Sequence, residues 1–140
     1  MERPGIEVNV VRIFLADDNA MIRAYLRATL EEHAEWVVVG EAENGRRAVE
    51  ACLKQAPNLA VMDLCMPVMD GLEAARQLRR QRPDVPILMI TVDPSRQLEK
   101  EAKKAGIRGI CSKSQIHCLW TAIEALLKGE TYFPVDSTAV

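Results

Sequence analysis

The chain alternates five short apolar runs with stretches of helical period, and this alternation restricts its fold more than any other feature. The apolar runs occupy residues 10–16, 36–40, 59–62, 86–90 and 109–112. Most are continuous, as expected of parallel strands covered on both faces. Apolar residues recur at helical spacing within residues 20–32, 45–55, 72–80, 97–105 and 115–128. Five strand–helix units with short connections predict an α/β fold: a doubly wound (βα)5 parallel sheet with right-handed crossovers.

The ends of the helical stretches carry residues that suit helix starts and stops. Asn44, Asp70 and Ser114 are placed to cap the second, third and last helices. Pro94 suits the first position of the fourth helix, and Gly106 falls where that helix should end.

Composition excludes several functional classes. The 140 residues suit one domain with one core, and 18 basic against 20 acidic side chains give a formal charge of −2. That balance offers neither a basic surface for nucleic acid nor a polybasic membrane anchor. No apolar stretch approaches the ~20 residues that span a bilayer. The run IFLA at 13–16 ends in two aspartates, unlike a signal peptide. We therefore expect a cytoplasmic location and no membrane partner.

The four cysteines follow no recognisable metal or redox spacing. Cys52, Cys65, Cys111 and Cys118 form no C-x-x-C pair, and each lies within an apolar pattern. We expect all four to be reduced thiols in or near the core.

Polar residues follow four of the five predicted strands. Asp17 and Asp18 follow the first, Asp63 ends the third, Thr91 ends the fourth and Lys113 follows the fifth. The carboxyl ends of parallel strands meet at the edge where open α/β sheets bind ligands. The sequence therefore predicts that these five side chains converge on one site.

The residue types at this edge indicate phosphoryl chemistry. Carboxylates held together repel unless one is protonated or a cation binds, and all-oxygen ligands suit Mg²⁺. Lys113 can pair with Asp63 or with a phosphoryl oxygen, to which Thr91 also offers a hydroxyl. Taken singly, the aspartates read as helix caps, the threonine as a strand former and the lysine as a solvated charge. Together they favour phosphoryl transfer to Asp63.

Four segments in this order resemble the response-regulator receiver domains of two-component signalling. They are LADDN (15–19), VMDLCMPVMDG (61–71), MITV (89–92) and CSKS (111–114), and the resemblance runs from about residue 10 to residue 129. It implies a flavodoxin-like fold with strand order 2-1-3-4-5. We expect a receiver domain over residues 1–129 and a linker-like tail over residues 130–140, where Pro134 and small polar residues lie.

The resemblance also implies roles for the individual residues. Asp63 would take a phosphoryl group from a sensor histidine kinase, and Thr91 and Lys113 would bind the phosphoryl oxygens. Mg²⁺ would be ligated by Asp18, Asp63 and the backbone carbonyl of Cys65, with Asp17 helping through water. Such a phosphoprotein catalyses only its own phosphorylation and dephosphorylation, and is not an enzyme in the usual sense.

The stretch AIEALLKGETYFP (122–134) resembles the last helix and exit of receivers in the NarL/LuxR class, which usually precede a DNA-binding domain. We therefore expect an excised receiver whose output domain, acting in transcription regulation, is absent from the chain. The resemblance places the output face on the fourth and fifth units. It also allows a weak or phosphorylation-dependent homodimer through the first and last helices, to which Leu119, Ile123 and Leu126 can contribute.

Two residues depart from the family pattern. Ile110 stands three positions before the lysine, where Tyr or Phe is usual, and Val92 follows Thr91, where a small residue is common. Isoleucine is smaller and stiff at χ1, so the aromatic switch is weakened or replaced. The bulk of Val92 would narrow the entrance to the site and slow hydrolysis. Cys65 and Asp93 would flank the path of attacking water, although Asp93 equally suits a helix cap.

Two other functions remain as alternatives. A pseudo-receiver would use the same fold for docking, or as a stand-alone module, and never be phosphorylated. An Mg²⁺-dependent hydrolase would need a second acid/base carboxylate near the nucleophile, which Asp63-Leu64-Cys65 does not provide.

Overall fold

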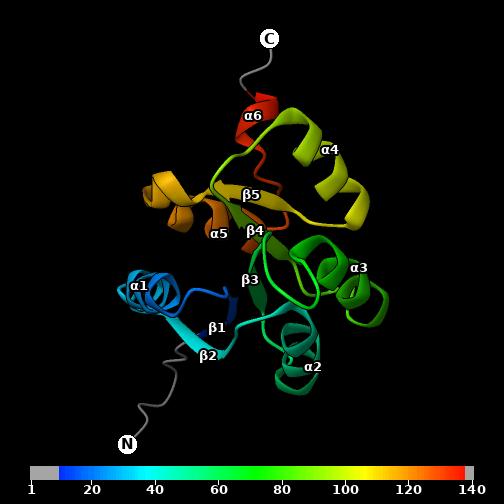
Figure 1. The fold of residues 1–140 in the computed structure, drawn as a ribbon. Helices are drawn as coiled ribbons and strands as arrows, with labels where there is room; N and C mark the ends of the chain where they lie inside the picture. Colours follow the sequence, from blue (N-terminus) through cyan, green and yellow to red (C-terminus); the bar gives the residue numbers. More distant parts are fainter. Residues whose placement is uncertain (1–9, 138–140) are drawn as a thin grey trace, which may run out of the picture.

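A computed structural model describes residues 10–137, in which a five-stranded parallel sheet lies between two layers of helices (Figure 1). The strands are β1 (Val11–Ala16), β2 (Trp36–Ala42), β3 (Leu59–Asp63), β4 (Ile87–Thr91) and β5 (Gly109–Ser112). The helices are α1 (Ala20–Glu31), α2 (Gly45–Gln55), α3 (Gly71–Gln81), α4 (Arg96–Ala105), the 3-10 helix η1 (Lys113–Cys118), α5 (Leu119–Leu127) and α6 (Pro134–Ser137). The strand order β2-β1-β3-β4-β5 confirms the predicted fold. Residues 1–9 and 138–140 of the expected receiver and tail lie outside the described residues.

The two faces of the sheet bury separate cores because successive strand residues point to opposite sides. Ile13 and Leu15 of β1 pack with α1 and α5, whereas Phe14 faces the cluster formed with α2, α3 and α4. Figure 1 shows α1 and α5 on one side of the sheet and α2, α3 and α4 on the other. Helices on both faces leave the carboxyl ends of the strands open as an edge for a site.

Most helix ends follow the predicted caps. Asn44 accepts the backbone N–H of Arg47, Asp70 accepts that of Glu73, and Gly106 ends α4 at a φ of +87°. The prediction that Pro94 begins the fourth helix was wrong, because Ser95 caps it by accepting the N–H of Leu98.

The last helix differs from its prediction. Its first turn is not α-helical: η1 comes first, and Gln115 has a non-helical backbone with φ −130° and ψ 58°. Ser114 therefore does not cap α5, which begins at Leu119. Instead the Ser112 side chain accepts the N–H of Ser114 and starts η1.

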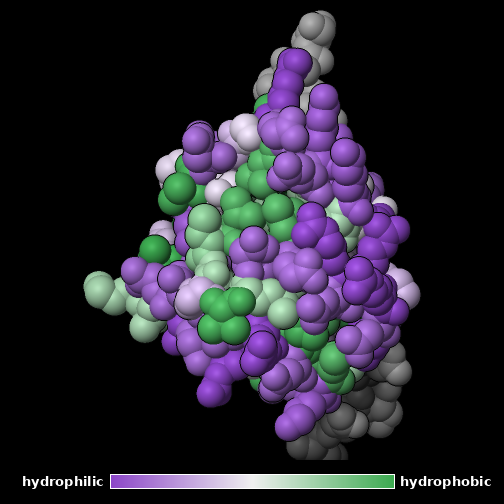
Figure 2. All heavy atoms as spheres, turned by 45° about the vertical axis from the view of Figure 1, so that its right-hand side comes forward, coloured by the Kyte–Doolittle hydropathy of each residue, from purple (hydrophilic) through white to green (hydrophobic). Residues whose placement is uncertain are grey.

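The segment after α5 packs on the edge of the sheet. The Ile110 N–H donates to the carbonyl of Tyr132 (2.8 Å), and the Tyr132 N–H donates to the carbonyl of Arg108 (3.0 Å). Further along, the Val135 N–H donates to Glu99, which is buried on α4. Residues 132–135, expected to be linker-like, thus cover the edge of β5. The face that carries α2, α3 and α4 is mainly hydrophilic, with a hydrophobic band through its upper middle (Figure 2).

The cysteines differ from the expectation of four reduced thiols. Cys111 on β5 and Cys118 at the end of η1 form a disulfide, with their Cα atoms 6.5 Å apart. Cys52 is a buried free thiol and Cys65 an exposed one. The prediction was wrong for the pair because η1 folds back toward β5, which no spacing rule reports.

The residues suggested for a dimer interface lie elsewhere. Leu119, Ile123 and Leu126 are buried in the core beneath α5, so they are not available to a second copy. The large exposed apolar side chains on α1 are Met21 and Tyr25. In the part of the chain that the structure describes, no helix combines the length and apolar composition needed to cross a bilayer.

Candidate functional site

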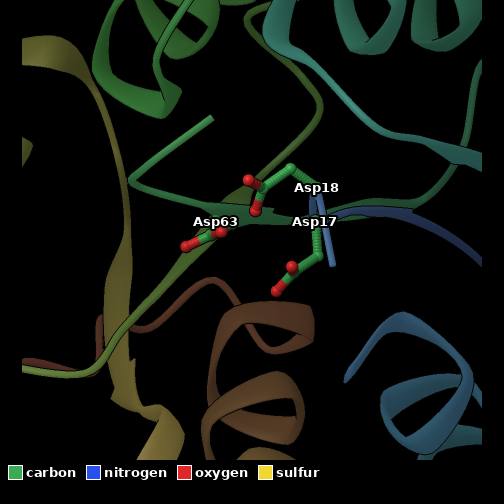
Figure 3. A group of neighbouring side chains, drawn as sticks. All are labelled: Asp17, Asp18 and Asp63. Carbon is green, nitrogen blue, oxygen red and sulfur yellow. The ribbon is translucent and has the colours of Figure 1, made fainter. Parts of the chain in front are cut away.

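Asp17, Asp18 and Asp63 meet at the carboxyl edge of the sheet, as predicted (Figure 3). Strands β1 and β3 pair Ala16 with Met62, so Asp17, which follows β1, and Asp63, the last residue of β3, lie at the same level. One carboxylate oxygen from each of the three aspartates lies within 4.8 Å of the others. The parallel register of β1 and β3 brings Asp63 to Asp17 and Asp18, which are adjacent in the sequence.

The three carboxylates differ in their surroundings. Asp17 is fully buried and Asp63 is 3% exposed, whereas Asp18 is exposed. Burial raises the pKa of Asp63 above its ordinary value, which Lys113 partly offsets and Asp17 reinforces. The Cys65 backbone N–H lies 3.4 Å from Asp63 Oδ1 and also favours the ionised form. Asp63 is thus a buried carboxylate that depends on nearby cations to stay charged.

Lys113 supplies one of those cations. Its Nζ lies 2.9 Å from Asp17 Oδ2 and 3.0 Å from Asp63 Oδ2. Burial alone lowers the pKa of Lys113, but the two carboxylates outweigh it and hold that pKa above its ordinary value. The lysine therefore stays protonated and bridges the two buried aspartates.

The acidic cluster fits a divalent cation. Asp17 Oδ2 is buried and has no hydrogen-bond partner among the described residues, only its ion pair with Lys113. An all-oxygen set with an exposed carboxylate, Asp18, leaves room for the water that hard cations such as Mg²⁺ retain. Cys65 follows two residues after Asp63 at the surface, where its backbone carbonyl was predicted to complete the set.

Thr91 lies beside this cluster at the end of β4. The pairing of Asp63 with Ile90 and of Thr91 with Ser112 puts the threonine between the acidic cluster and the start of η1. Thr91 is buried, and its hydroxyl accepts the Asp93 N–H at 3.4 Å. The next residue, Val92, is 71% exposed. All the predicted side chains are therefore brought to one edge.

Ile110 takes a purely internal position. It is fully buried and belongs to the core cluster that includes Leu98 and Ala102 of α4. The residue at the family's aromatic position thus packs behind α4 instead of reaching the site.

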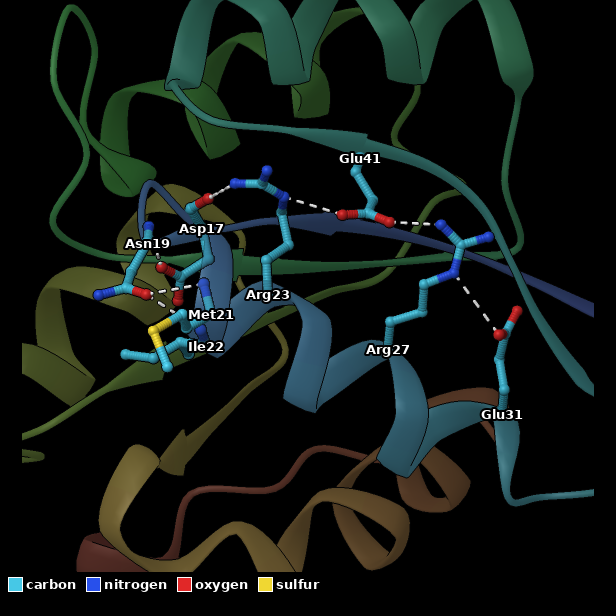
Figure 4. A network of polar contacts seen from close by, with 8 residues as sticks. All are labelled: Asp17, Asn19, Met21, Ile22, Arg23, Arg27, Glu31 and Glu41. Carbon is cyan, nitrogen blue, oxygen red and sulfur yellow. Dashed lines mark hydrogen bonds and ion pairs between the residues drawn. The ribbon is translucent and has the colours of Figure 1, made fainter.

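A network of polar contacts that the sequence did not predict supports Asp17 (Figure 4). Arg23 donates to the Asp17 carbonyl at 2.7 Å and to Glu41 at 2.8 Å, and Glu41 also pairs with Arg27. Asn19 caps α1 and donates its own N–H to Asp17 Oδ1. No local signal marks these pairs, because Arg23 and Glu41 are 18 residues apart and meet only through the pairing of β1 with β2.

Comparisons with known proteins agree with this geometry. The family model described as "Response regulator receiver domain" matches residues 13–124. The response regulator UvrY of Escherichia coli K12 is 35% identical over 128 residues, which cover 91% of this chain and 59% of UvrY. The chain thus spans about three fifths of that relative's length.

Two solved structures have the same fold. A two-component response regulator of the LuxR family from Aurantimonas sp. SI85-9A1 aligns with a TM-score of 0.85 at 32% identity, covering 88% of this chain and 89% of that one. The isolated REC domain of RcsB from Salmonella enterica serovar Typhimurium, determined in the presence of phosphomimetic BeF3−, aligns with a TM-score of 0.82 at 26% identity. The alignment covers 92% of this chain and 98% of that one.

Proposed function

This chain belongs to the response regulator receiver domain family, and from that membership we propose that Asp63 accepts a phosphoryl group from a sensor histidine kinase in an Mg²⁺-dependent reaction. The observation that carries the proposal is the position of Asp63: buried, level with Asp17 and in contact with Lys113. A buried carboxylate paired with a lysine, which can bind a phosphoryl oxygen in its place, suits a group that must alternate between a bare and a phosphorylated state.

Each residue of the site would have its own role in the phosphoryl transfer. An Asp63 carboxylate oxygen attacks the phosphorus of phosphohistidine, a P–O bond forms, and the P–N bond breaks as the imidazole leaves with the electron pair. Lys113, released from Asp63, binds a phosphoryl oxygen, and the Thr91 hydroxyl donates to another. Asp17, Asp18, Asp63 and the Cys65 carbonyl would hold the Mg²⁺, which neutralises charge on the transferring group.

The role that follows is a conformational switch and not a turnover reaction. Phosphorylation would bias a two-state equilibrium through Thr91 and the surface of α4 and β5. In the longer relatives the chain matches only part of the protein, so we propose that the switch controls a DNA-binding output domain of the LuxR type. We further propose a cytoplasmic location and a weak or phosphorylation-dependent dimer that uses the exposed side chains of α1.

Intact mass spectrometry tests the proposal directly. After incubation with acetyl phosphate and Mg²⁺, the wild-type chain is expected to gain one phosphoryl group. The gain should disappear with a chelator and in Asp63→Asn, whose amide keeps the shape of the side chain but is not a nucleophile. Retention of the gain in Asp63→Asn would disprove Asp63 as the acceptor.

A docking module that is never phosphorylated is the second candidate. The observation that favours it is Ile110, which is sealed in the core where the family usually has an aromatic switch residue. A wild-type chain that takes no phosphoryl group from acetyl phosphate or from a kinase, yet folds normally, would support this candidate.

Val92 is expected to lengthen the life of the phosphorylated state. Because it is exposed directly after Thr91, its bulk shields the entrance from attacking water without contributing to the core. Val92→Ala should shorten the phosphoryl half-life several-fold and change the free energy of unfolding by no more than about 0.5 kcal/mol. The half-life is followed by intact mass after removal of acetyl phosphate; an unchanged value would contradict the shielding role.

A further inference from the structure

We propose that Cys111 and Cys118 form a reversible disulfide that controls the position of Lys113, making this loop a redox-sensitive modification site. The disulfide closes a ring of eight residues, and Lys113 lies inside it, two positions after Cys111. The same lysine is the residue that bridges Asp17 and Asp63. A bond that restrains this ring therefore restrains the only lysine seen to contact the acidic cluster among the described residues.

The two cysteines have the unequal surroundings that a reactive pair needs. Cys111 is fully buried at the end of β5, whereas Cys118 is half-buried at the end of η1 and is reachable from solvent. A cavity of about 410 Å³ opens beside Cys118 and is lined also by Val92 and Tyr132. An external thiol or disulfide can therefore meet Cys118 first, with Cys111 placed behind it as the resolving group.

The other two cysteines are not suited to this role. Cys52 is buried, and burial raises its pKa to about 12, so it is not a nucleophile near neutral pH. Cys65 is exposed but has no second cysteine paired with it in the described structure. Only Cys111 and Cys118 lie close enough to bond without a change in the backbone.

The chemistry requires a disulfide oxidant such as oxidised glutathione. The Cys118 thiolate attacks one sulfur, forming a mixed disulfide and releasing one glutathione thiolate. The Cys111 thiolate then attacks Cys118 Sγ, and the second glutathione thiolate leaves. Two electrons pass to the oxidant and the two cysteine protons end on the two glutathione thiols; a dithiol reverses the exchange. In a reducing compartment such a bond is transient and regulatory rather than structural, so this step rests on the cytoplasmic location proposed above.

The bond acts on Lys113 through the freedom of η1. This segment is a 3-10 helix that contains a non-helical residue, Gln115. Its backbone hydrogen bonds therefore restrain it less than those of a regular α-helix would. With the disulfide formed, the ring holds Lys113 against Asp17 and Asp63. With the thiols reduced, η1 explores more conformations and the lysine leaves the carboxylates more often. Oxidation should therefore keep Lys113 beside Asp17 and Asp63 for a larger fraction of the time.

The first measurement maps the bond itself. The full chain is equilibrated with oxidised or reduced glutathione, quenched in acid, alkylated under denaturing conditions, and analysed by intact mass and peptide mapping. The expected result is two protected cysteines after oxidation, mapped to 111 and 118, and none after reduction. Cys118→Ser should leave no protected internal pair. Four alkylated cysteines in the oxidised wild type, or a bond that involves Cys52 or Cys65, would overturn the proposal.

The second measurement reads the position of Lys113 without phosphorylation. Brief acylation of lysines, followed by peptide mapping, is expected to label Lys113 several-fold more slowly in the oxidised chain than in the reduced chain. Lys54, exposed on α2, serves as the internal reference. In Cys118→Ser the redox dependence should vanish; equal labelling of Lys113 in both forms of the wild type would overturn the coupling. Neither measurement depends on the phosphorylation of Asp63. A failure of the redox proposal can therefore be distinguished from a failure of the proposed phosphorylation.

Discussion

Replacing Lys113 by Ala is expected to slow the phosphorylation of Asp63 by about 100-fold or more, the largest functional effect of any substitution outside the acceptor. The lysine is aimed at the acidic cluster from 2.9 and 3.0 Å, so it needs little rearrangement to meet the charge that develops on a transferring phosphoryl group. Removing one such pre-placed hydrogen-bond donor from an enzyme active site lowers the rate by about two to three orders of magnitude.

The same variant should bind Mg²⁺ more tightly. Lys113 and a divalent cation compete for the oxygens of Asp17 and Asp63, and a unit charge about 4 Å away contributes on the order of 1 kcal/mol even in water. The dissociation constant for Mg²⁺ is therefore expected to fall about fivefold. Isothermal titration calorimetry with Mg²⁺ measures it, and Lys54→Ala, which removes an exposed lysine on α2, is the matched control.

The stability of Lys113→Ala should depend on pH in a defined direction. The pKa of Lys113 is raised in the folded state, so its contribution is complete below its ordinary pKa of 10.5 and is lost as the pH rises through the folded value. The pKa of Asp63 is also raised, so ionising it costs stability as the pH rises from its ordinary 3.8 through the folded value. Without the lysine that cost grows. The free energy of unfolding of the variant should be lower than that of the wild type by about 2 kcal/mol at neutral pH, and by much less in acid. This loss lies between the values typical of exposed and of buried ion pairs.

Urea unfolding at several pH values tests this dependence. A loss for Lys113→Ala that is equal at acid and neutral pH would show that the effect comes from packing and not from charge. An unchanged phosphorylation rate would remove the lysine from the chemistry altogether.

Gly71→Ala is expected to lower the free energy of unfolding by about 2–3 kcal/mol, the cost of overpacking a site that cannot relax. Gly71 begins α3 directly over the end of β3, and a Cβ there would overlap the carbonyl oxygen of Asp63 and lie 3.1 Å from the Leu64 Cα. The Gly71 N–H also donates to the Leu64 carbonyl at 2.9 Å. Because these neighbours are backbone, α3 or the acceptor strand must shift.

Gly40→Ala is the matched control for that substitution. A Cβ at Gly40 would overlap only the end of the Gln55 side chain, which can turn away, so the loss of stability should be smaller. Denaturation by urea compares the two variants, and intact mass compares their phosphorylation by acetyl phosphate. Gly71→Ala should be the weaker acceptor as well as the less stable protein. A greater loss in Gly40→Ala would contradict the proposed contact between α3 and Asp63.

The amino-acid sequence by itself determined the alternating elements, the parallel sheet and the site residues. Continuous apolar runs and helical spacing are local patterns, and caps such as Asn44 and Asp70 act within one turn. Asp17, Asp63 and Lys113 could be placed together without coordinates because one rule, that parallel strands end at the same edge, turns chain position into spatial position.

Only the tertiary structure decided the contacts that join distant elements or break local regularity. Arg23 meets Glu41 through strand pairing, Tyr132 returns to the edge of β5, and Cys111 bonds to Cys118 because η1 is not the α-helix that periodicity predicts. The physical reason is common to all three. Periodicity and capping report free energies that residues gain from their near neighbours in the chain. The partners of these side chains depend instead on the positions of whole elements, which packing sets only once the sheet and its helices have formed.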